Sequence, residues 1–142
     1  AQLLSDKFSS NKGKLPWPVQ KGYVSLKYGK QPHPVVKTAT IQSNGIRIIT
    51  ASSQKARTIF NGTIYRIISS KNGSKTILIQ HGNFFTVYKN LSDIYVNKGD
   101  KVFTKQEIGL IMTNKNSGQT ILSFSLFKDN KTENPLFWIG KK

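Results

Sequence analysis

The sequence predicts an all-β fold: a single domain of antiparallel sheets, with no long helix apart from a possible N-terminal tail. Short runs rich in β-branched and aromatic residues recur about every 8–12 residues, with turn signals between them, a pattern typical of sandwiches and barrels. After Phe8, no segment has the apolar periodicity of an amphipathic helix of useful length. The length of 142 residues fits one domain.

The expected elements follow in order along the chain. Residues 1–12 are expected to be a tail or the end of a helix, which stops at the breaker Ser9–Gly13. Asn61-Gly62 is a strong signal for a two-residue hairpin, and Asn and Gly also mark turns at 71–74, 81–83 and 97–100. The expected strands are Tyr23–Tyr28, Gly45–Ile49, Lys55–Phe60, Thr63–Ser69, Thr76–His81, Phe84–Lys89, Asp93–Val96, Lys101–Phe103, Glu107–Met112 and Thr120–Lys128.

The last of these strands is the most informative, because its alternate positions form two distinct faces. The apolar face, which we assign to the core, comprises Leu122, Phe124 and Leu126. The opposite face comprises Ile121, Ser123, Ser125 and Phe127. That second face is small and mixed, so it suits the floor of a shallow groove or, alternatively, a half-solvated outer surface.

Lysine dominates the charge of the chain. There are 22 Lys and Arg against 6 Asp and Glu, which gives a net charge of +16. Such a charge admits nucleic acid, anionic lipid, an anionic wall polymer or an acidic protein as partner. The scarcity of arginine argues against base-specific readout of nucleic acid. Alternatively, nucleotide bias in the source genome raises the lysine content. The sequence contains no apolar run of about 18 residues, so it predicts no membrane-spanning helix.

The inventory of reactive side chains predicts a non-enzyme. The chain has no cysteine, which removes thiolate ligands and cysteine nucleophiles. Its two histidines, His33 and His81, lack the spacing that places metal ligands on one face. The acidic residues lie mostly in turns, and no nucleophile elbow or phosphate loop is present. We therefore expect no metal and no cofactor.

Several different short motifs follow one another in a fixed order along most of the chain. They are Lys14–Val19 with Val24–Gly29, Asn44–Ile48, Ala56–Ile64, Ile79–Asn83 with Thr86–Ser92, Val96–Val102 with Gln106–Gly109, Thr120–Ser125 and Asn134–Ile139. Together they resemble LytM-type domains of the lysostaphin-like metallopeptidase family, over roughly residues 13–142. The resemblance implies that family's fold of antiparallel sheets.

The same resemblance implies that this domain has lost its metal. The family's first zinc His falls on Ser43, the zinc Asp on Arg47 and the last zinc His on Ser123. The two histidines expected to assist catalysis fall on Asn90 and Ile121. A guanidinium repels Zn²⁺ and cannot be deprotonated. A degenerate, non-catalytic domain is therefore expected.

The Leu-Pro-Trp-Pro-Val entry and the tryptophan near the C-terminus make the chain similar to the EnvC-type murein hydrolase activators. That resemblance implies a protein that binds a periplasmic zinc-dependent amidase and relieves its autoinhibition during cell separation. The metal-free groove would receive the amidase's regulatory helix. The resemblance also implies a periplasmic location in a Gram-negative bacterium. Residues 1–12 would then end a preceding coiled-coil region, and residues 13–142 would form the LytM domain.

We expect the partner to bind residues that the family topology brings around one cleft. They are Ser43, Arg47, Tyr88, Asn90, Ser123 and Ser125. Arg47 is expected to be the only fixed charge at the cleft floor and to pair with a carboxylate of the incoming helix. Alternatively, Arg47 binds nearby backbone carbonyls or an internal acid.

The same sequence features are consistent with other functions. The same groove suits a module that binds peptidoglycan directly or serves as an envelope scaffold. A nucleic-acid binder rests on the charge alone, and an active hydrolase needs stoichiometric zinc.

Overall fold

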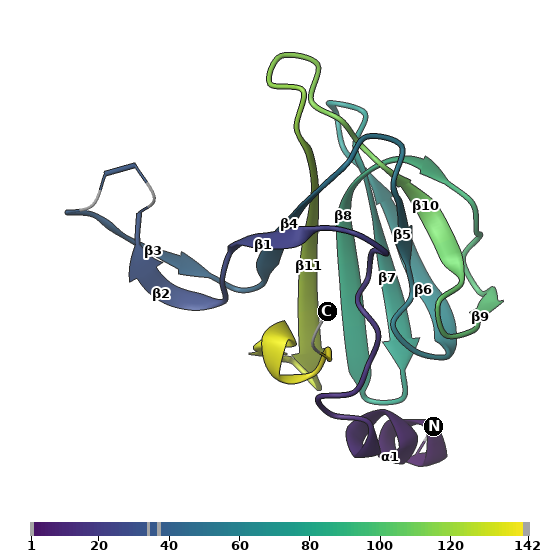
Figure 1. Ribbon diagram of the computed structural model, residues 1–142. Coiled ribbons are helices and arrows are strands. Elements are labelled where there is room, and N and C mark those ends of the chain that lie inside the picture. Colours follow the sequence, from purple (N-terminus) through teal and green to yellow (C-terminus); the bar gives the residue numbers. More distant parts are fainter. Residues whose placement is uncertain (1, 34, 37, 141–142) are drawn as a thin grey trace.

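The computed structural model describes residues 2–33, 35–36 and 38–140, and Figure 1 shows its architecture. A short helix, α1 (Gln2–Ser10), precedes the strands, and a 3-10 helix, η1 (Pro135–Phe137), follows them. The strands are β1 (Tyr23–Leu26), β2 (Gly29–Pro32), β3 (Thr40–Ser43), β4 (Ile46–Thr50), β5 (Lys55–Arg57), β6 (Gly62–Ser69), β7 (Lys75–His81), β8 (Phe84–Ile94), β9 (Lys101–Val102), β10 (Glu107–Ile111), β11 (Thr120–Lys128) and β12 (Lys131–Glu133). No helix within the described ranges is long and apolar enough to cross a membrane.

Most strands belong to one antiparallel sheet in the order β1-β4-β11-β8-β7-β6-β9. Strand β10 pairs with both β5 and β8, and β12 returns alongside β11. Strands β2 and β3 form a separate hairpin that projects from the body of the molecule (Figure 1). The predicted all-β domain of antiparallel sheets is thereby confirmed.

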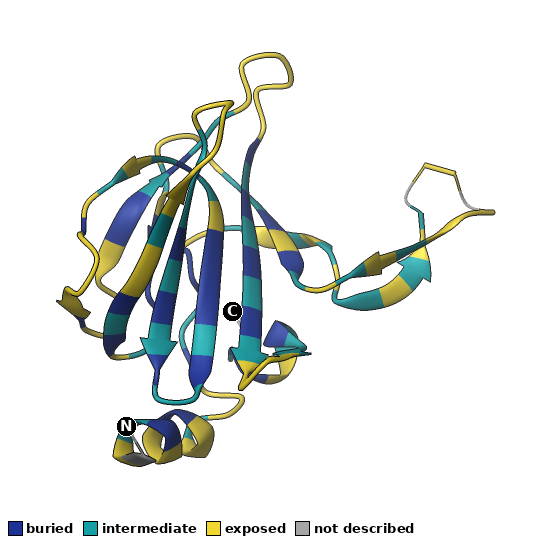
Figure 2. Cartoon of the chain, turned by 180° about the vertical axis from the view of Figure 1, so that it is seen from behind, coloured by how far each residue is buried: buried dark blue, intermediate teal, exposed yellow. Residues whose placement is uncertain are grey.

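The core lies against one face of the large sheet, and β11 shows how the sequence defines that face. Leu122, Phe124 and Leu126 are fully buried, while the positions between them are only partly buried. Buried and intermediate residues accordingly alternate along this strand in Figure 2. Alternate residues of a strand point to opposite faces. The predicted apolar face is therefore confirmed, and the other set of side chains projects from the outer face.

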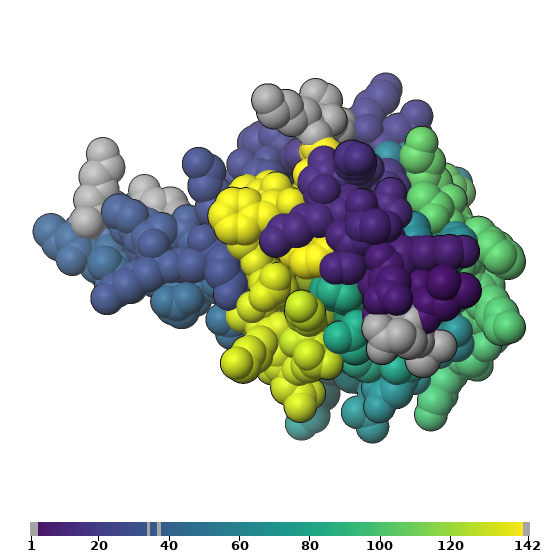
Figure 3. Space-filling model, turned by 90° about the horizontal axis from the view of Figure 1, so that it is seen from below, coloured from purple at the N-terminus to yellow at the C-terminus, as the bar shows by residue number. Residues whose placement is uncertain are grey.

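Helix α1 is packed against the same core through Phe8, which is fully buried. The ring of Phe8 stacks on that of Phe84 with 4.5 Å between centroids, and it lies 5.3 Å from the ring of Trp138. Seen from below in Figure 3, the first residues (purple) and the last residues (yellow) lie side by side. The domain boundary after residue 12 remains a prediction.

Strand β8 is longer than expected, because it runs from the predicted strand Phe84–Lys89 through Asn90 into the first two residues of the predicted strand Asp93–Val96, which ends early at Ile94. Asn90 makes this continuity possible. Thr76 pairs with Lys89 and Lys75 pairs with Leu91, so Asn90 is the extra residue of a bulge. Its φ of 78° lies in the left-handed region, which asparagine tolerates better than most residues.

The hairpin predicted at Asn61-Gly62 is wrong. Strand β5 pairs with β10, whereas β6 pairs with β7 and β9. Glycine is required at position 62 for a different reason. A Cβ atom at Gly62 would lie 2.6 Å from the carbonyl oxygen of Gln80 and 2.7 Å from Nδ1 of His81. Gly62 is thus required for close approach to β7 rather than for a turn.

The β2–β3 hairpin was not expected from the sequence. The Pro32-His33-Pro34 segment indicated an irregular loop, and Gly29–Pro32 contains no β-branched residue. The structure pairs Gly29 with Ser43 and Gln31 with Ile41. This pairing carries Ser43 to the edge of the large sheet, where it forms part of the groove described next.

Candidate functional site

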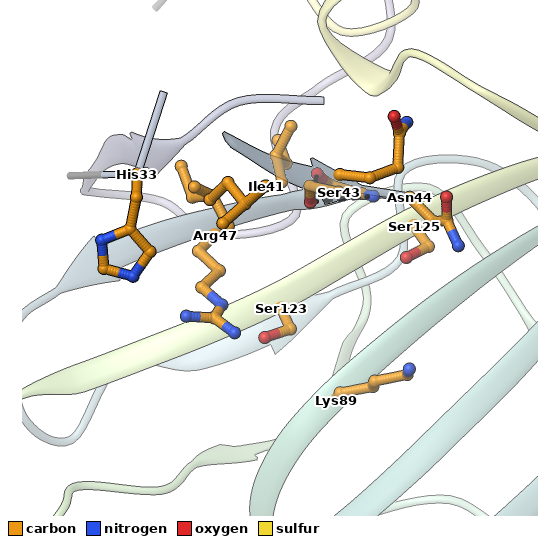
Figure 4. A pocket seen from close by; sticks show the side chains of 12 residues that line it. His33, Ile41, Ser43, Asn44, Arg47, Lys89, Ser123 and Ser125 are labelled. Carbon is orange, nitrogen blue, oxygen red and sulfur yellow. Dashed lines mark hydrogen bonds between the residues drawn. The ribbon is translucent and has the colours of Figure 1, made fainter. Parts of the chain in front are cut away.

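A groove of about 690 Å³ opens where the β2–β3 hairpin meets the large sheet (Figure 4). Its side chains come from β1, β3, β4, β8 and β11, from the loop between β3 and β4, and from His33 directly after β2. Among them are four of the six residues predicted to bind a partner, namely Ser43, Arg47, Ser123 and Ser125. The structure therefore brings these four together, and their role in binding stays a prediction.

Arg47, Ser123 and Lys89 form one row across three neighbouring strands. Ser123 of β11 pairs with Arg47 of β4 on one side and with Lys89 of β8 on the other. Residues in register on adjacent strands project from the same face of a sheet. In Figure 4 the guanidinium of Arg47 and the side chain of Lys89 lie on either side of the Ser123 hydroxyl. The floor of the groove is therefore a hydroxyl between two cations.

Neither cation of this row is neutralised by the part of the chain that the structure describes. The guanidinium of Arg47 and the ammonium of Lys89 have no hydrogen bond or ion pair there, where the one ion pair joins Lys55 to Glu107 at 3.9 Å. The residues that line the groove include no Asp or Glu. The alternative that Arg47 binds backbone carbonyls or an internal acid finds no support among the described residues.

Lys89 also corrects one expectation, since Arg47 is not the only fixed charge at the floor. In the sequence, Lys89 only ends the expected strand Phe84–Lys89, and no role was predicted for it. Its place in the groove depends on the pairing of Lys89 with Ser123, which a single sequence does not reveal.

His33 was missed for a similar reason. It lines the groove from the end of the β2–β3 hairpin, and its Nδ1 accepts hydrogen bonds from the amides of Val35 and Val36.

The loop from β3 to β4 holds Ser43 over the groove. The Ser43 hydroxyl donates to the carbonyl oxygen of Gly45 at 2.7 Å. A side chain at Gly45 would collide with the carbonyl oxygen of Phe124 and the hydroxyl of Ser125. Glycine at this position therefore allows the loop to pass directly over β11. Ser43 and Ser125 therefore line the same groove.

Asn90 lies beside the row in an adjoining hollow of about 330 Å³. Arg47, Lys89 and Ser123 line this hollow as well, so it continues the groove across β8 toward Thr76 of β7. The Asn90 side chain donates to the carbonyl oxygen of Ile121 at 2.7 Å. Its amide nitrogen thus ties the bulge of β8 to β11 and borders the groove.

Tyr88 does not line the groove, and the expectation that a partner contacts it is corrected. Tyr88 is fully buried on the core face of β8, where its ring lies 5.2 Å from that of Phe124. Its hydroxyl accepts a hydrogen bond from the backbone amide of Ile59 at 3.2 Å. Burial raises the pKa of Tyr88 to about 12. The physical reason is alternation: Lys89 faces outward, so its neighbour Tyr88 faces inward.

His81, the second histidine of the chain, is a core residue far from the groove lining. It is fully buried, and its ring nitrogens are hydrogen-bonded to the carbonyl oxygen of Asn61 at 2.8 Å and to the hydroxyl of Thr86 at 2.9 Å. Burial lowers the pKa of His81 to about 4. The imidazole is therefore neutral at pH 7 and acts as a structural link between β7, β8 and the segment before β6.

The described residues of the groove offer zinc only one typical donor, the imidazole of His33, and no thiolate or carboxylate. Zinc in proteins is held by thiolates, imidazoles and carboxylates. The positions Ser43, Arg47 and Ser123 offer two neutral hydroxyls and one permanent cation instead. Among the described residues no group of three or more His, Cys, Asp or Glu side chains is placed to hold a metal ion. What the groove can do chemically is bind an anion or donate hydrogen bonds.

Solved structures with the same fold come from several proteins. Helicobacter pylori Csd3 is 22% identical with a TM-score of 0.75, over 92% of this chain and 36% of that one. A zinc-containing peptidase from Vibrio cholerae is 22% identical with a TM-score of 0.72, over 88% and 40%. The SpoIIQ–SpoIIIAH pore-forming complex contains a chain that is 20% identical with a TM-score of 0.69, over 90% and 92%.

At these identities the likeness shows the fold alone, and the chain spans well under half the length of the first two proteins. A search of curated proteins gave no match. The model of Peptidase family M23 matches residues 41–135, which include every residue of the row and most of the groove. This chain therefore belongs to peptidase family M23.

Proposed function

We propose that this chain is a non-catalytic M23 domain that acts by binding. Its partner is a periplasmic zinc-dependent N-acetylmuramoyl-L-alanine amidase, whose autoinhibition it relieves to promote peptidoglycan hydrolysis in cell separation. One observation carries the proposal. Ser43, Arg47 and Ser123, the positions to which the sequence resemblance assigns the zinc ligands of LytM-type domains, line a single groove. By that resemblance the groove corresponds to an active-site cleft, and the side chains at these three positions are not zinc ligands.

The shape and lining of the groove support a helix as its occupant. The floor side chains at Ser123 and Ser125 are short, and Ser43 on the wall is equally small. Laying a helix into a groove is a common recognition mode, with specificity supplied by the side chains on the facing side of the helix. Activation then follows from differential binding. The domain binds the amidase state in which the regulatory helix is released, and so raises the population of that state.

The comparisons support partner binding in a general way. The SpoIIQ chain of the same fold is described in complex with another protein, SpoIIIAH. Domains of this fold therefore include at least one that works with a protein partner. The identity of the partner here, the EnvC-type role and the periplasmic location rest on the sequence resemblance.

Release of dye from labelled sacculi tests the proposal directly. Three samples are compared: this domain alone, the candidate amidase alone, and the two together. We expect dye release in the mixture well above that of the amidase alone, and none from the domain. Release by the domain alone would make it a hydrolase, and a mixture no more active than the amidase would remove the proposed role.

A second candidate function is direct binding of peptidoglycan. The observation that favours it is the pair of unneutralised cations at the groove floor, in a chain of net charge +16. Carboxylates of the peptidoglycan stem peptides would complement that charge. Co-sedimentation with purified sacculi at physiological salt, without any amidase, separates the two functions. Retention that depends on Arg47 favours the peptidoglycan module.

A further inference from the structure

The groove has a direction, which the register of the sheet defines. The groove and the adjoining hollow share Arg47, Ser123 and Lys89, and the hollow reaches Thr76. These four residues are register partners on neighbouring strands: Arg47 of β4 pairs with Ser123 of β11, which pairs with Lys89 of β8, which pairs with Thr76 of β7. Along this row an open trough therefore crosses the strands, and the groove also extends along β4 and β11 to Gly45 and Ser125.

We infer that this row selects an acidic helix that lies across the strands and carries two carboxylates seven residues apart. The inference rests on the proposed function, because it assumes that a protein partner occupies the groove. It adds the orientation of that partner, the chemistry of its contact face and the spacing of its charges. It also gives Lys89 a role equal to that of Arg47.

The spacing follows from sheet and helix geometry. Neighbouring strands lie about 4.8 Å apart, so Arg47 and Lys89, two strands apart, are separated by about 10 Å at the backbone. A helix rises 1.5 Å per residue, so residues seven apart are separated by about 10.5 Å and lie on the same face. One carboxylate then meets Arg47 and the other meets Lys89. Ser123, between them, presents only a short hydroxyl and leaves room for the helix.

The charges of the site match this ligand and no cationic one. Arg47 and Lys89 are both exposed and have no ion pair in the described part of the chain. No acidic side chain lines the groove to compete for them. A helix that covers the row removes both cations from water, and charge pairs strengthen as water is excluded. The wrong charge on the incoming helix would be strongly rejected for the same reason.

The outer face next to the row favours a protein rather than a glycan as the source of the carboxylates. Four residues farther along the same face, β8 and β11 present Phe85 and Phe127 in register, and Tyr65 lies edge-on to Phe85 with 5.2 Å between the ring centroids. Tyr65 is 48% exposed. An amphipathic protein segment supplies both acidic and apolar groups, whereas stem peptides supply carboxylates without large apolar side chains.

The test uses designed probes and the domain in the form described here. The probes are capped, alanine-based helical peptides with Glu at positions i and i+7, with Glu at i and i+4, or with Gln at i and i+7. Binding is followed at low salt by the amide NMR shifts of the domain around Ser123. We expect the i, i+7 Glu peptide to bind at least about fivefold more tightly than the Gln peptide, as two exposed ion pairs allow. The i, i+4 peptide should bind less tightly.

Variants of the domain test whether the preference for the Glu peptide depends on Arg47 and Lys89. Arg47→Gln and Lys89→Gln should each remove most of the preference for the Glu peptide, and Arg66→Gln, which removes an exposed charge of β6 outside the groove, should not. A double reversal, Arg47→Glu with Lys89→Glu, should transfer the preference to a Lys, Lys peptide. Equal binding of the Glu and Gln peptides, or equal losses in the Arg66→Gln control, would overturn the inference. So would soluble muropeptides that bind through the row when the Glu peptides do not.

The dye-release assay keeps this inference separate from the proposed function. An amidase that is activated although the Glu peptides fail to bind would refute only the acidic-helix inference. Failure of activation would refute the proposed function, whatever the peptides do.

Discussion

Arg47 and Ser123 face each other in register across two antiparallel strands, on the open floor of a groove. In LytM-type domains, the resemblance assigns both positions to zinc ligands. Here their side chains are a permanent cation and a neutral hydroxyl, and Lys89 adds a second cation on the far side of Ser123. The register thus places a permanent cation, a hydroxyl and a second cation side by side, an arrangement that can attract an anion.

Restoring the family's ligands should restore metal binding. The triple variant Ser43→His, Arg47→Asp, Ser123→His places three zinc donors around one groove, with a fourth position left to water. We expect about one zinc per chain after dialysis against zinc, measured by elemental analysis, and far less in the unaltered protein. Circular dichroism checks that the variant folds. A folded variant without zinc would mean that the three positions do not correspond to the family's ligands.

Tyr88→Phe should weaken folding and leave the groove intact. The change removes the hydroxyl that accepts a hydrogen bond from the buried amide of Ile59. An unpaired buried donor costs about 1–3 kcal/mol in the free energy of unfolding, which urea denaturation measures. Amidase activation should be unchanged at a temperature where the variant is folded. A loss of activation without a loss of stability would return Tyr88 to the contact surface.

The stability of the domain should fall between pH 7 and pH 5 because of His81. Burial lowers the pKa of His81 from 6.5 to about 4 in the folded protein, so the unfolded chain takes up a proton first as the pH falls. The stabilising effect is complete above about pH 6.5 and is lost toward pH 4. This difference predicts a decrease of about 2 kcal/mol from pH 7 to pH 5 in the free energy of unfolding.

Two variants make the pH effect specific. His81→Asn should flatten the pH dependence, whatever it costs in stability at pH 7. Leu3→Ala, an exposed change that alters no titratable group, should retain the wild-type slope. Identical slopes in the His81→Asn variant and the wild type would exclude His81 as the titrating group.

Helix α1 should contribute to the stability of the domain through a single side chain. Phe8 is fully buried among the rings of Phe84 and Trp138, so Phe8→Ala should lower the free energy of unfolding by about 3–5 kcal/mol. The matched control is Leu3→Ala, since Leu3 lies on the same helix and is 65% exposed. That change should cost about 0.5 kcal/mol or less. Equal effects of the two changes would show that α1 does not stabilise the fold.

Much of the fold was predictable because strands carry their own signal. The alternation of Leu122, Phe124 and Leu126 with serines identified both faces of β11 from sequence alone. The prediction was wrong where a residue is determined by its contact with a strand that is distant in the sequence. Gly62 was interpreted as a turn, but it is needed for close contact with β7. The β2–β3 hairpin was missed because its first strand has little β propensity and is paired only with β3.

The groove was predictable only in part, for a related reason. Ser43, Arg47 and Ser123 could be located because the family resemblance supplied their counterparts. Lys89 has no such counterpart, and its role depends on a register that places it beside Ser123. Tyr88 was misassigned because a motif identifies a segment of chain, whereas alternation decides which of its neighbouring side chains faces the groove.

The central claim is that the groove floor engages an amidase, and charge reversal at Arg47 tests it most directly. In the dye-release assay, Arg47→Glu should abolish activation, because it places a carboxylate opposite the acidic groups expected on the partner. Its melting temperature should stay within a few degrees of the wild type, since Arg47 is exposed and has no partner in the described residues. Arg66→Glu, the same reversal outside the groove, should activate normally. A folded Arg47→Glu protein that activates the amidase fully would contradict the account.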